Sequence, residues 1–223
     1  MVPEHPRIKF CGITNLDDAH CAAEAGAWAL GMIFWPASRR ACSVDEAQVI
    51  GSSLRRTAEL CGVFVNASLD EISATAEAVP LSMVQLHGEE GPAFATEVAR
   101  RTGAKVAKAS RVRSRADLQA AAAFHTSFHL LDAHVEGLRG GTGETIDWEL
   151  VRAHRFAAPV ILSGGLTHEN VSAAIAVTEP FAVDVASGTE RAPGLKDPEK
   201  LAAFAAAVKA TAPDPEPEQE RVA

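Results

Sequence analysis

Tyrosine is absent from the 223 residues of this chain, which excludes a tyrosine as an acid, base or nucleophile. No apolar run approaches the roughly 20 residues that a membrane-spanning helix needs. The N-terminal segment MVPEHPRIKF has no apolar stretch behind a basic one, so we expect no secretory signal. These absences predict a cytoplasmic protein that is not held at a membrane.

Basic residues are also fewer than acidic ones. The 21 Lys and Arg residues face 29 Asp and Glu residues, which gives a net charge of −8 at neutral pH. This balance argues against nucleic acid or an anionic membrane as the main partner, because both attract basic surfaces. A small anionic ligand is still allowed, since one site can be locally positive in an acidic protein.

Cysteine is scarce, and its spacing does not suggest a metal site. No two of the four cysteines form a CxxC pair, and no histidine cluster has zinc spacing, so we expect no metal. A reducing compartment would leave the thiols free. We interpret Cys21, Cys42 and Cys61 as small buried apolar side chains, whereas Cys11 needs separate treatment.

Short apolar segments are abundant and alternate with longer Ala-rich ones. Eight of them are three to six residues long and are mostly β-branched, aromatic or Leu. This composition is typical of strands buried on both faces of a parallel sheet. The predicted strands are Ile8–Cys11, Ala29–Phe34, Leu60–Val65, Met83–Leu86, Ala104–Ala107, Phe128–Leu131, Val160–Leu162 and Ala182–Val185.

Helix signals separate these segments. The run Asn15–Asp18 offers a cap before an Ala-rich stretch, and Ser43 with Glu46 three residues later predicts a capping box. Two later helices are predicted to open at Thr167–Asn170 and at Asp197–Pro198, the second with Pro at its first position.

Eight β–α units predict an α/β fold, a single-domain (β/α)8 TIM barrel over residues 1–210. A doubly wound open sheet uses the same units and is the alternative. The count of eight and the positions of the polar motifs favour the barrel. Residues 211–223 are acidic and rich in proline, which predicts a disordered tail. We expect a monomer or a homodimer.

The carboxyl ends of the strands carry the active site of such a barrel. Cys11 ends the first segment and is predicted to point into the barrel mouth, either as a filler or as a base or nucleophile. A thiol with the ordinary pKa of about 8.5 is mostly protonated at pH 7, so a base would need a positive neighbour. Lys9 shares the face of Cys11 by strand alternation and is one candidate.

Three further strand ends carry charged or titratable groups. Arg40 follows the second segment and either clamps a carboxylate or belongs to an exposed basic loop. His87 follows the fourth segment and either acts as an acid, a base or a hydrogen-bond donor, or orients a loop. Asp132 follows the sixth, where desolvation would raise its pKa and make it a general acid, or it closes a loop.

Small-residue loops follow the last two segments, at 163–166 and 184–188. Loops in this order predict the usual phosphate site of the fold, where backbone N–H groups bind the anion. A thiol, a carboxylic acid, a carboxylate clamp and a phosphate cradle together predict a phosphorylated small-molecule substrate with a second anionic group.

Six motifs, taken in order, resemble the phosphoribosylanthranilate isomerase family of tryptophan biosynthesis, from about residue 7 to residue 209. They are KFCGIT at 9–14, GVFVN at 62–66, VQLHG at 84–88, GGTG at 140–143, LSGGL at 162–166 and VDVASG at 183–188. The resemblance implies a (β/α)8 barrel that uses neither metal nor cofactor. It implies an Amadori rearrangement of N-(5-phosphoribosyl)anthranilate to 1-(2-carboxyphenylamino)-1-deoxyribulose 5-phosphate.

The resemblance also implies individual roles. Asp132 would protonate the ribose ring oxygen, Cys11 as thiolate would remove the C2′ proton, and Arg40 would bind the anthranilate carboxylate. His87 would line the site. The phosphate would lie on the backbone of Gly164, Gly165, Ser187 and Gly188, with Asp184 nearby.

One departure and two alternatives accompany this prediction. Glu144 stands where a basic residue is common in the family, so no positive charge is implied in that loop. A sugar isomerase of the histidine-pathway type would have an Asp at the end of the first strand instead of Cys11. A barrel that only binds a phosphorylated ligand would need neither Cys11 nor Asp132.

Overall fold

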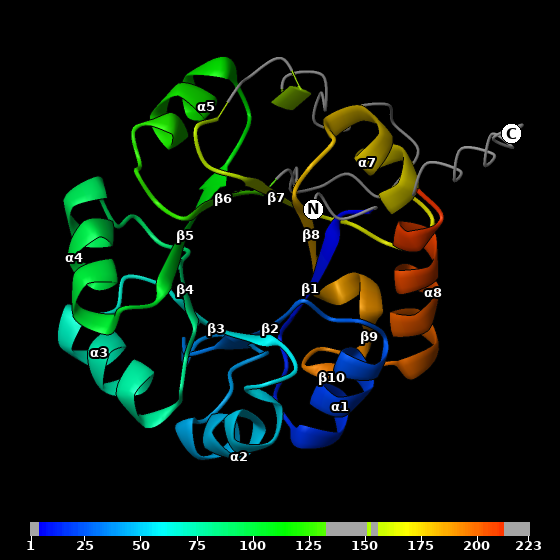
Figure 1. Ribbon diagram of the computed structural model, residues 1–223, viewed down its shortest axis with the longest axis horizontal. Coiled ribbons are helices and arrows are strands. Elements are labelled where there is room, and N and C mark those ends of the chain that lie inside the picture. Colours follow the sequence, from blue (N-terminus) through cyan, green and yellow to red (C-terminus); the bar gives the residue numbers. More distant parts are fainter. Residues whose placement is uncertain (1–4, 133–150, 153–155, 212–223) are drawn as a thin grey trace, which may run out of the picture.

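The computed structural model describes residues 5–132, 151–152 and 156–211. Eight parallel strands close into a barrel in chain order, and helices surround it (Figure 1). The barrel is closed because β1 pairs with β2 on one side and β8 on the other, which rules out the open sheet. The strands are β1 (Arg7–Cys11), β2 (Ala29–Ile33), β3 (Glu59–Phe64), β4 (Met83–Leu86), β5 (Lys105–Arg111), β6 (Phe128–Asp132), β7 (Val160–Ser163) and β8 (Ala182–Val185).

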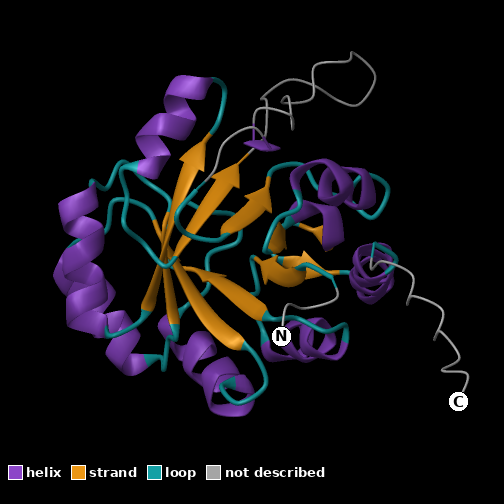
Figure 2. Cartoon of the chain, turned by 45° about the horizontal axis from the view of Figure 1, so that its top comes forward, coloured by secondary structure: helices purple, strands orange, loops and turns teal. Residues whose placement is uncertain are grey.

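Helices pack around the outside of the strands (Figure 2). Predicted caps are confirmed at Asn15, which accepts from the N–H of Asp18, and at Asp197, which opens the last helix with Pro198 at its first turn. The described helices are α1 (Leu16–Glu24), α2 (Val44–Leu54), α3 (Leu69–Ala78), α4 (Pro92–Thr102), α5 (Arg115–Ala122), α7 (Val171–Thr178) and α8 (Pro198–Lys209).

One predicted capping box and one predicted helix start differ in the structure. The Ser43 hydroxyl accepts from the N–H of Glu46, but the reciprocal capping boxes stand at the starts of α3 and α5. The later helix begins at Val171 rather than at Thr167, because the side-chain oxygen of Asn170 accepts from the N–H of Thr167. That bond turns the chain before the helix can start.

The fifth strand is longer than predicted and runs past Ala107 to Arg111. The apolar pattern stops at Lys108, yet this lysine is only 5% exposed. Its ammonium group donates to Glu90 Oε2 over 2.9 Å, so the charge is paired inside the fold. The predicted strand is therefore too short, because a charged residue interrupts the apolar pattern but not the strand.

Alternation along β1 divides its residues between two layers of the protein. Ile8 and Phe10 face outward into the apolar layer beneath the helices, and the Phe10 ring meets Phe204 of α8 at 6.1 Å. Lys9 is fully buried, and Cys11 joins the apolar cluster that fills the barrel. The alternation predicted for Lys9 and Cys11 is confirmed.

A short antiparallel hairpin between β8 and α8 has no counterpart in the sequence prediction. The turn η1 (Ser187–Thr189) leads into β9 (Glu190–Ala192), which pairs with β10 (Leu195–Lys196). Gly194 makes the turn with φ of +79°, a conformation that favours glycine. The hairpin returns the chain toward the end of β1.

The remaining sequence expectations have mixed outcomes. All four cysteines are unpaired, and Cys42 and Cys61 are buried as predicted, but Cys21 on α1 is only half-buried. In the part of the chain that the structure describes, no helix is both long and apolar enough to cross a membrane. The glycine loop with Glu144, and the predicted tail beyond residue 211, lie outside the described residues. The domain boundary, the cytoplasmic location and the oligomeric state stay predictions.

Replacing Phe204 by Ala is expected to lower the free energy of unfolding by about 3–5 kcal/mol, because the ring is fully buried between α8 and β1. Urea unfolding followed by circular dichroism measures the change. Val49→Ala on α2 is the control, since Val49 is 51% exposed and its loss should change little. A loss for Phe204→Ala no larger than the control would contradict the packing of α8.

Candidate active site

The site is built at the carboxyl end of the barrel. Cys11 ends β1 and Asp132 ends β6, and β7 and β8 separate these two strands in the closed sheet. Asp132 lies opposite Ser163 of β7 in register, and Cys11 lies opposite Gly31 of β2. The predicted thiol and carboxylic acid therefore belong to the same rim.

A buried ion pair lies directly beneath this rim. Lys9 Nζ donates to Asp184 Oδ1 over 2.6 Å, and Ser163 donates to Asp184 Oδ2 over 2.9 Å. Burial is the largest single effect and lowers the pKa of Lys9, but Asp184, the neighbouring thiols of Cys11 and Cys61, and the hydrogen bond to Asp184 together raise it above the ordinary value. Lys9 is therefore cationic. Asp184, predicted near the phosphate, is the counter-ion of a lysine.

The Cys11 thiol lies beside this lysine. A Cβ on Gly31 would come within 2.9 Å of Cys11 Sγ and 3.1 Å of Lys9 Nζ, so the glycine leaves room for both. Burial raises the pKa of Cys11, Lys9 opposes that effect, and Asp184 adds to it, with a raised pKa as the result. The positive neighbour is where the sequence predicted it, but the resting thiol stays protonated at neutral pH.

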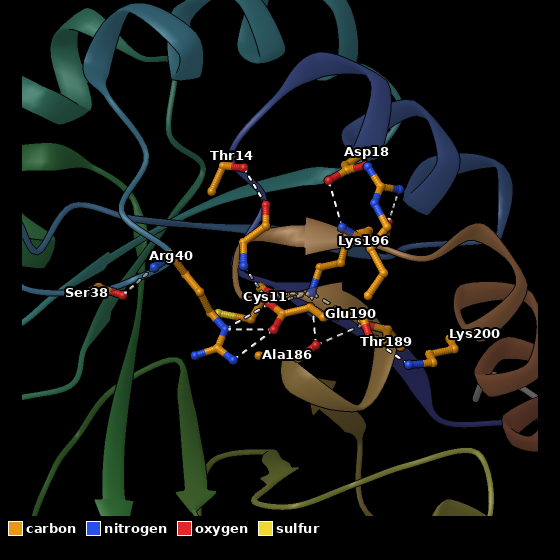
Figure 3. A network of polar contacts seen from close by, with 12 residues as sticks. Cys11, Thr14, Asp18, Ser38, Arg40, Ala186, Thr189, Glu190, Lys196 and Lys200 are labelled. Atoms are coloured by element: carbon orange, nitrogen blue, oxygen red, sulfur yellow. Dashed lines mark hydrogen bonds and ion pairs between the residues drawn. The ribbon is translucent and has the colours of Figure 1, made fainter.

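Arg40 already holds a carboxylate of the protein. Its Nε lies 2.8 Å from Glu190 Oε1, and its Nη2 lies 2.8 Å from Glu190 Oε2, a two-point pair (Figure 3). The Arg40 side chain is 27% exposed and that of Glu190 is 4% exposed. Sequence reasoning found the arginine and missed its partner, since 150 positions separate them.

His87 and Asp132 face each other across the mouth. His87 Nε2 lies 4.0 Å from Asp132 Oδ2, and the side chains are 33% and 22% exposed. His87 Nδ1 lies 2.8 Å from the amide nitrogen of Gln85, which fixes the ring. Partial burial lowers the pKa of His87 more than Asp132 raises it, so the ring is neutral near pH 7. A neutral ring that accepts from Gln85 carries its proton on Nε2, toward Asp132.

The two predicted phosphate loops pack against each other. Gly164 and Gly165 have φ of +103° and +61°, a conformation that turns the chain sharply after β7. A Cβ on Gly188 would fall 2.1 Å from the carbonyl oxygen of Leu166, so only glycine permits this approach. Ser187 begins the turn η1 beside it. The loops form one continuous backbone surface.

A pocket of about 500 Å³ opens on the β4–β6 side of the mouth. Its polar lining includes His87, Lys108, Arg111 and Asp132. Sequence reasoning missed Lys108, although a lysine that continues an apolar strand was a usable signal. Among the described residues, no group of three or more His, Cys, Asp or Glu side chains is arranged to hold a metal ion.

Comparison with known proteins identifies relatives over most of the chain. The sequence profile of the family described as N-(5'phosphoribosyl)anthranilate (PRA) isomerase matches residues 8–207. An N-(5'-phosphoribosyl)anthranilate isomerase of Citrifermentans bemidjiense is 45% identical over 203 residues, which cover 91% of this chain and 97% of the relative.

Two solved structures are also similar. The phosphoribosyl anthranilate isomerase of Thermotoga maritima superimposes with a TM-score of 0.84 at 41% identity, over 92% of this chain and 99% of that one. A phosphoribosyl anthranilate isomerase in complex with reduced 1-(o-carboxyphenylamino)-1-deoxyribulose 5-phosphate gives a TM-score of 0.80 at 40% identity, over 92% and 99% of the chains.

The Cys11 thiol is expected to react with iodoacetamide with a midpoint above the ordinary thiol pKa of about 8.5, because burial disfavours the thiolate. Replacing Lys9 by Met should move that midpoint to higher pH, since Lys9 lowers the pKa of the thiol. Mass spectrometry of the Cys11 peptide across pH 6–11 measures both values.

The matched control is Lys105→Met, which removes an exposed lysine paired with Glu59 at the start of β5. It should leave the midpoint where it is. An unchanged or lower midpoint in Lys9→Met would overturn the electrostatic role of Lys9.

Proposed function

The chain belongs to the N-(5'-phosphoribosyl)anthranilate isomerase family, enzymes of tryptophan biosynthesis, and we propose that Cys11 and Asp132 are its general base and general acid. The observation that carries this proposal is their common position, at the ends of β1 and β6 on one rim of the barrel. A thiol and a carboxyl group on opposite sides of one mouth can act on neighbouring atoms of a single substrate.

The first step opens the ribose ring. Asp132, in its protonated form, donates a proton to the ring oxygen while the bond from that oxygen to C1′ breaks. The lone pair of the anthranilate nitrogen forms a C=N bond, which leaves a cationic imine. Asp132 lines the pocket at the mouth and its side chain is 22% exposed, so a substrate in that pocket can reach the carboxyl group, which supports this assignment.

The second step removes the proton from C2′. The Cys11 thiolate takes it, and the electron pair moves into the C1′–C2′ bond to give a neutral enolamine. This product becomes the ketone when the 2′-hydroxyl loses its proton and C1′ gains one. The imine cation of the first step and the Lys9 ammonium group both favour the thiolate, which offsets the effect of burial.

Substrate binding is proposed to engage both ends of the molecule. Arg40 takes the anthranilate carboxylate, and the backbone around Gly164, Gly165, Ser187 and Gly188 takes the phosphate. One relative is described in complex with a reduced form of the product, which carries both anionic groups. His87 lines the site between these ends.

Replacing Cys11 by Ala is expected to reduce turnover of N-(5'-phosphoribosyl)anthranilate by about 10²–10⁴-fold or more, because no other group would take the C2′ proton. Asp132→Asn should lose a similar factor, since an amide does not donate a proton of comparable acidity. The decay of anthranilate fluorescence measures turnover, and calorimetry with the reduced product measures binding.

Both variants should bind the reduced product with a dissociation constant within about threefold of that of the unchanged protein, since neither side chain is proposed to bind the ligand. Cys21→Ala on α1 is the control and should keep full turnover. Wild-type rates in either site variant would remove that residue from its proposed role. Lost turnover together with lost binding would indicate a binding role instead.

Gly188→Ala is expected to raise the KM by about tenfold or more, because the added methyl group must push the phosphate loops apart. Inorganic phosphate should also inhibit this variant less strongly than the unchanged protein. Gly91→Ala is the control, since nothing lies within 4 Å of a Cβ there. An unchanged KM and unchanged phosphate inhibition would argue against this phosphate site.

A further inference from the structure

The hairpin after β8 brings two buried charged side chains to the mouth of the barrel. Glu190 of β9 is 7% exposed and Lys196 of β10 is fully buried. Neither belongs to the reacting groups proposed above. Buried charges are retained in a fold only when they are paired or hydrogen-bonded, so their contacts indicate what they hold in place.

Lys196 ties the hairpin to the strand ends on both sides. Its ammonium group donates to the carbonyl oxygens of Cys11 over 2.6 Å and of Ala186 over 3.0 Å, and to Thr189 Oγ1 over 3.3 Å. Three acceptors match the three protons of an ammonium group. The end of β1, the end of β8 and the hairpin are therefore joined at one nitrogen (Figure 3).

Glu190 extends this connection to Arg40. Its Oε1 lies 3.6 Å from Lys196 Nζ, and both of its carboxylate oxygens accept from Arg40. The aliphatic part of Arg40 packs across Gly12, where a Cβ would come within 2.9 Å of Arg40 Cδ. Gly12 directly follows Cys11, so the arginine is held against the turn that carries the thiol.

The pairing uses only one edge of the guanidinium group. Nε and Nη2 are occupied by Glu190, and Nη1 has no partner within the described part of the chain. The Glu190 side chain is only 4% exposed, whereas the Arg40 side chain is 27% exposed. Two cations, Arg40 and Lys196, share one carboxylate, which leaves a positive charge on the exposed side. This edge fits an anionic, planar group such as a carboxylate.

We propose that Glu190 is a positioning residue, which fixes Arg40 relative to Cys11 so that the free edge of the guanidinium selects substrates with a carboxylate on the aromatic ring. The inference rests on the proposed role of Arg40 in binding that carboxylate. It adds that Glu190 sets the orientation of Arg40, and that this orientation makes binding specific for a carboxylate on the ring. Without Glu190, the long Arg40 side chain would sample several rotamers. Binding would then have to order the side chain, and this loss of entropy would weaken the affinity.

The test compares two ligands that differ only in the ring carboxylate. One is reduced 1-(o-carboxyphenylamino)-1-deoxyribulose 5-phosphate, and the other is the same compound with an unsubstituted phenyl ring. Glu190→Gln should weaken the first at least tenfold and leave the second within twofold, as measured by calorimetry. In turnover, the KM should rise at least tenfold while kcat stays within about threefold.

The matched control is Glu97→Gln on α4. Glu97 also binds an arginine through both oxygens, Arg100, but on the exposed surface. This variant should leave both dissociation constants unchanged. Glu190→Asp keeps the negative charge on a shorter side chain and should recover part of the lost affinity for the carboxylate ligand. It serves as a second test if Glu190→Gln folds poorly.

Arg40→Gln separates this inference from the proposed function. If Arg40→Gln weakens both ligands equally, or neither, the carboxylate-binding role of Arg40 fails. If it weakens only the carboxylate ligand while Glu190→Gln does not, Glu190 has no positioning role and the inference is overturned. Equal weakening of both ligands by Glu190→Gln would also overturn it, since that result indicates general distortion. The Arg40→Gln, Glu190→Gln double variant should bind no more weakly than Arg40→Gln alone.

Discussion

The ion pair between Lys9 and Asp184 lies inside the barrel, where β1 meets β8 and the sheet closes on itself. The two residues are opposite each other in register, and Ser163 binds the second oxygen of Asp184. Removing one partner of such a buried pair costs about 3–5 kcal/mol, because the other charge is left without compensation. The same pair also acts on the pKa of Cys11, so one contact lies both at the closure of the barrel and beside its thiol.

The sequence predicted the barrel because strands buried on both faces must be apolar, and their limits are therefore visible in composition. Cys11 and Asp132 were predicted for a related reason, since each is a polar group that ends an apolar strand. The pairing of Glu190 with Arg40 was not predictable in this way, because 150 positions separate them. The hairpin from β9 to β10 is held by buried charges rather than by an apolar pattern, and periodicity does not report such contacts.

The mouth of the barrel gathers cationic side chains in a chain that is acidic overall. The net charge is −8, yet several cations gather at the strand ends, each tied to a carboxylate of the protein. Each of these cations is paired with a carboxylate, so its charge is compensated locally. Overall charge therefore describes the outer surface of this protein and says little about its site. The pairs are Lys9 with Asp184, Lys108 with Glu90, and both Arg40 and Lys196 with Glu190.

The burial of Cys11 also bears on the durability of the protein. A thiolate attacks peroxides and disulfides far faster than a thiol does, so a cysteine that is protonated at rest is oxidised slowly. Cys11 is 6% exposed, and burial raises its pKa, so its thiol is protonated at rest. The burial that disfavours the thiolate therefore also protects Cys11 against oxidation while the protein is at rest.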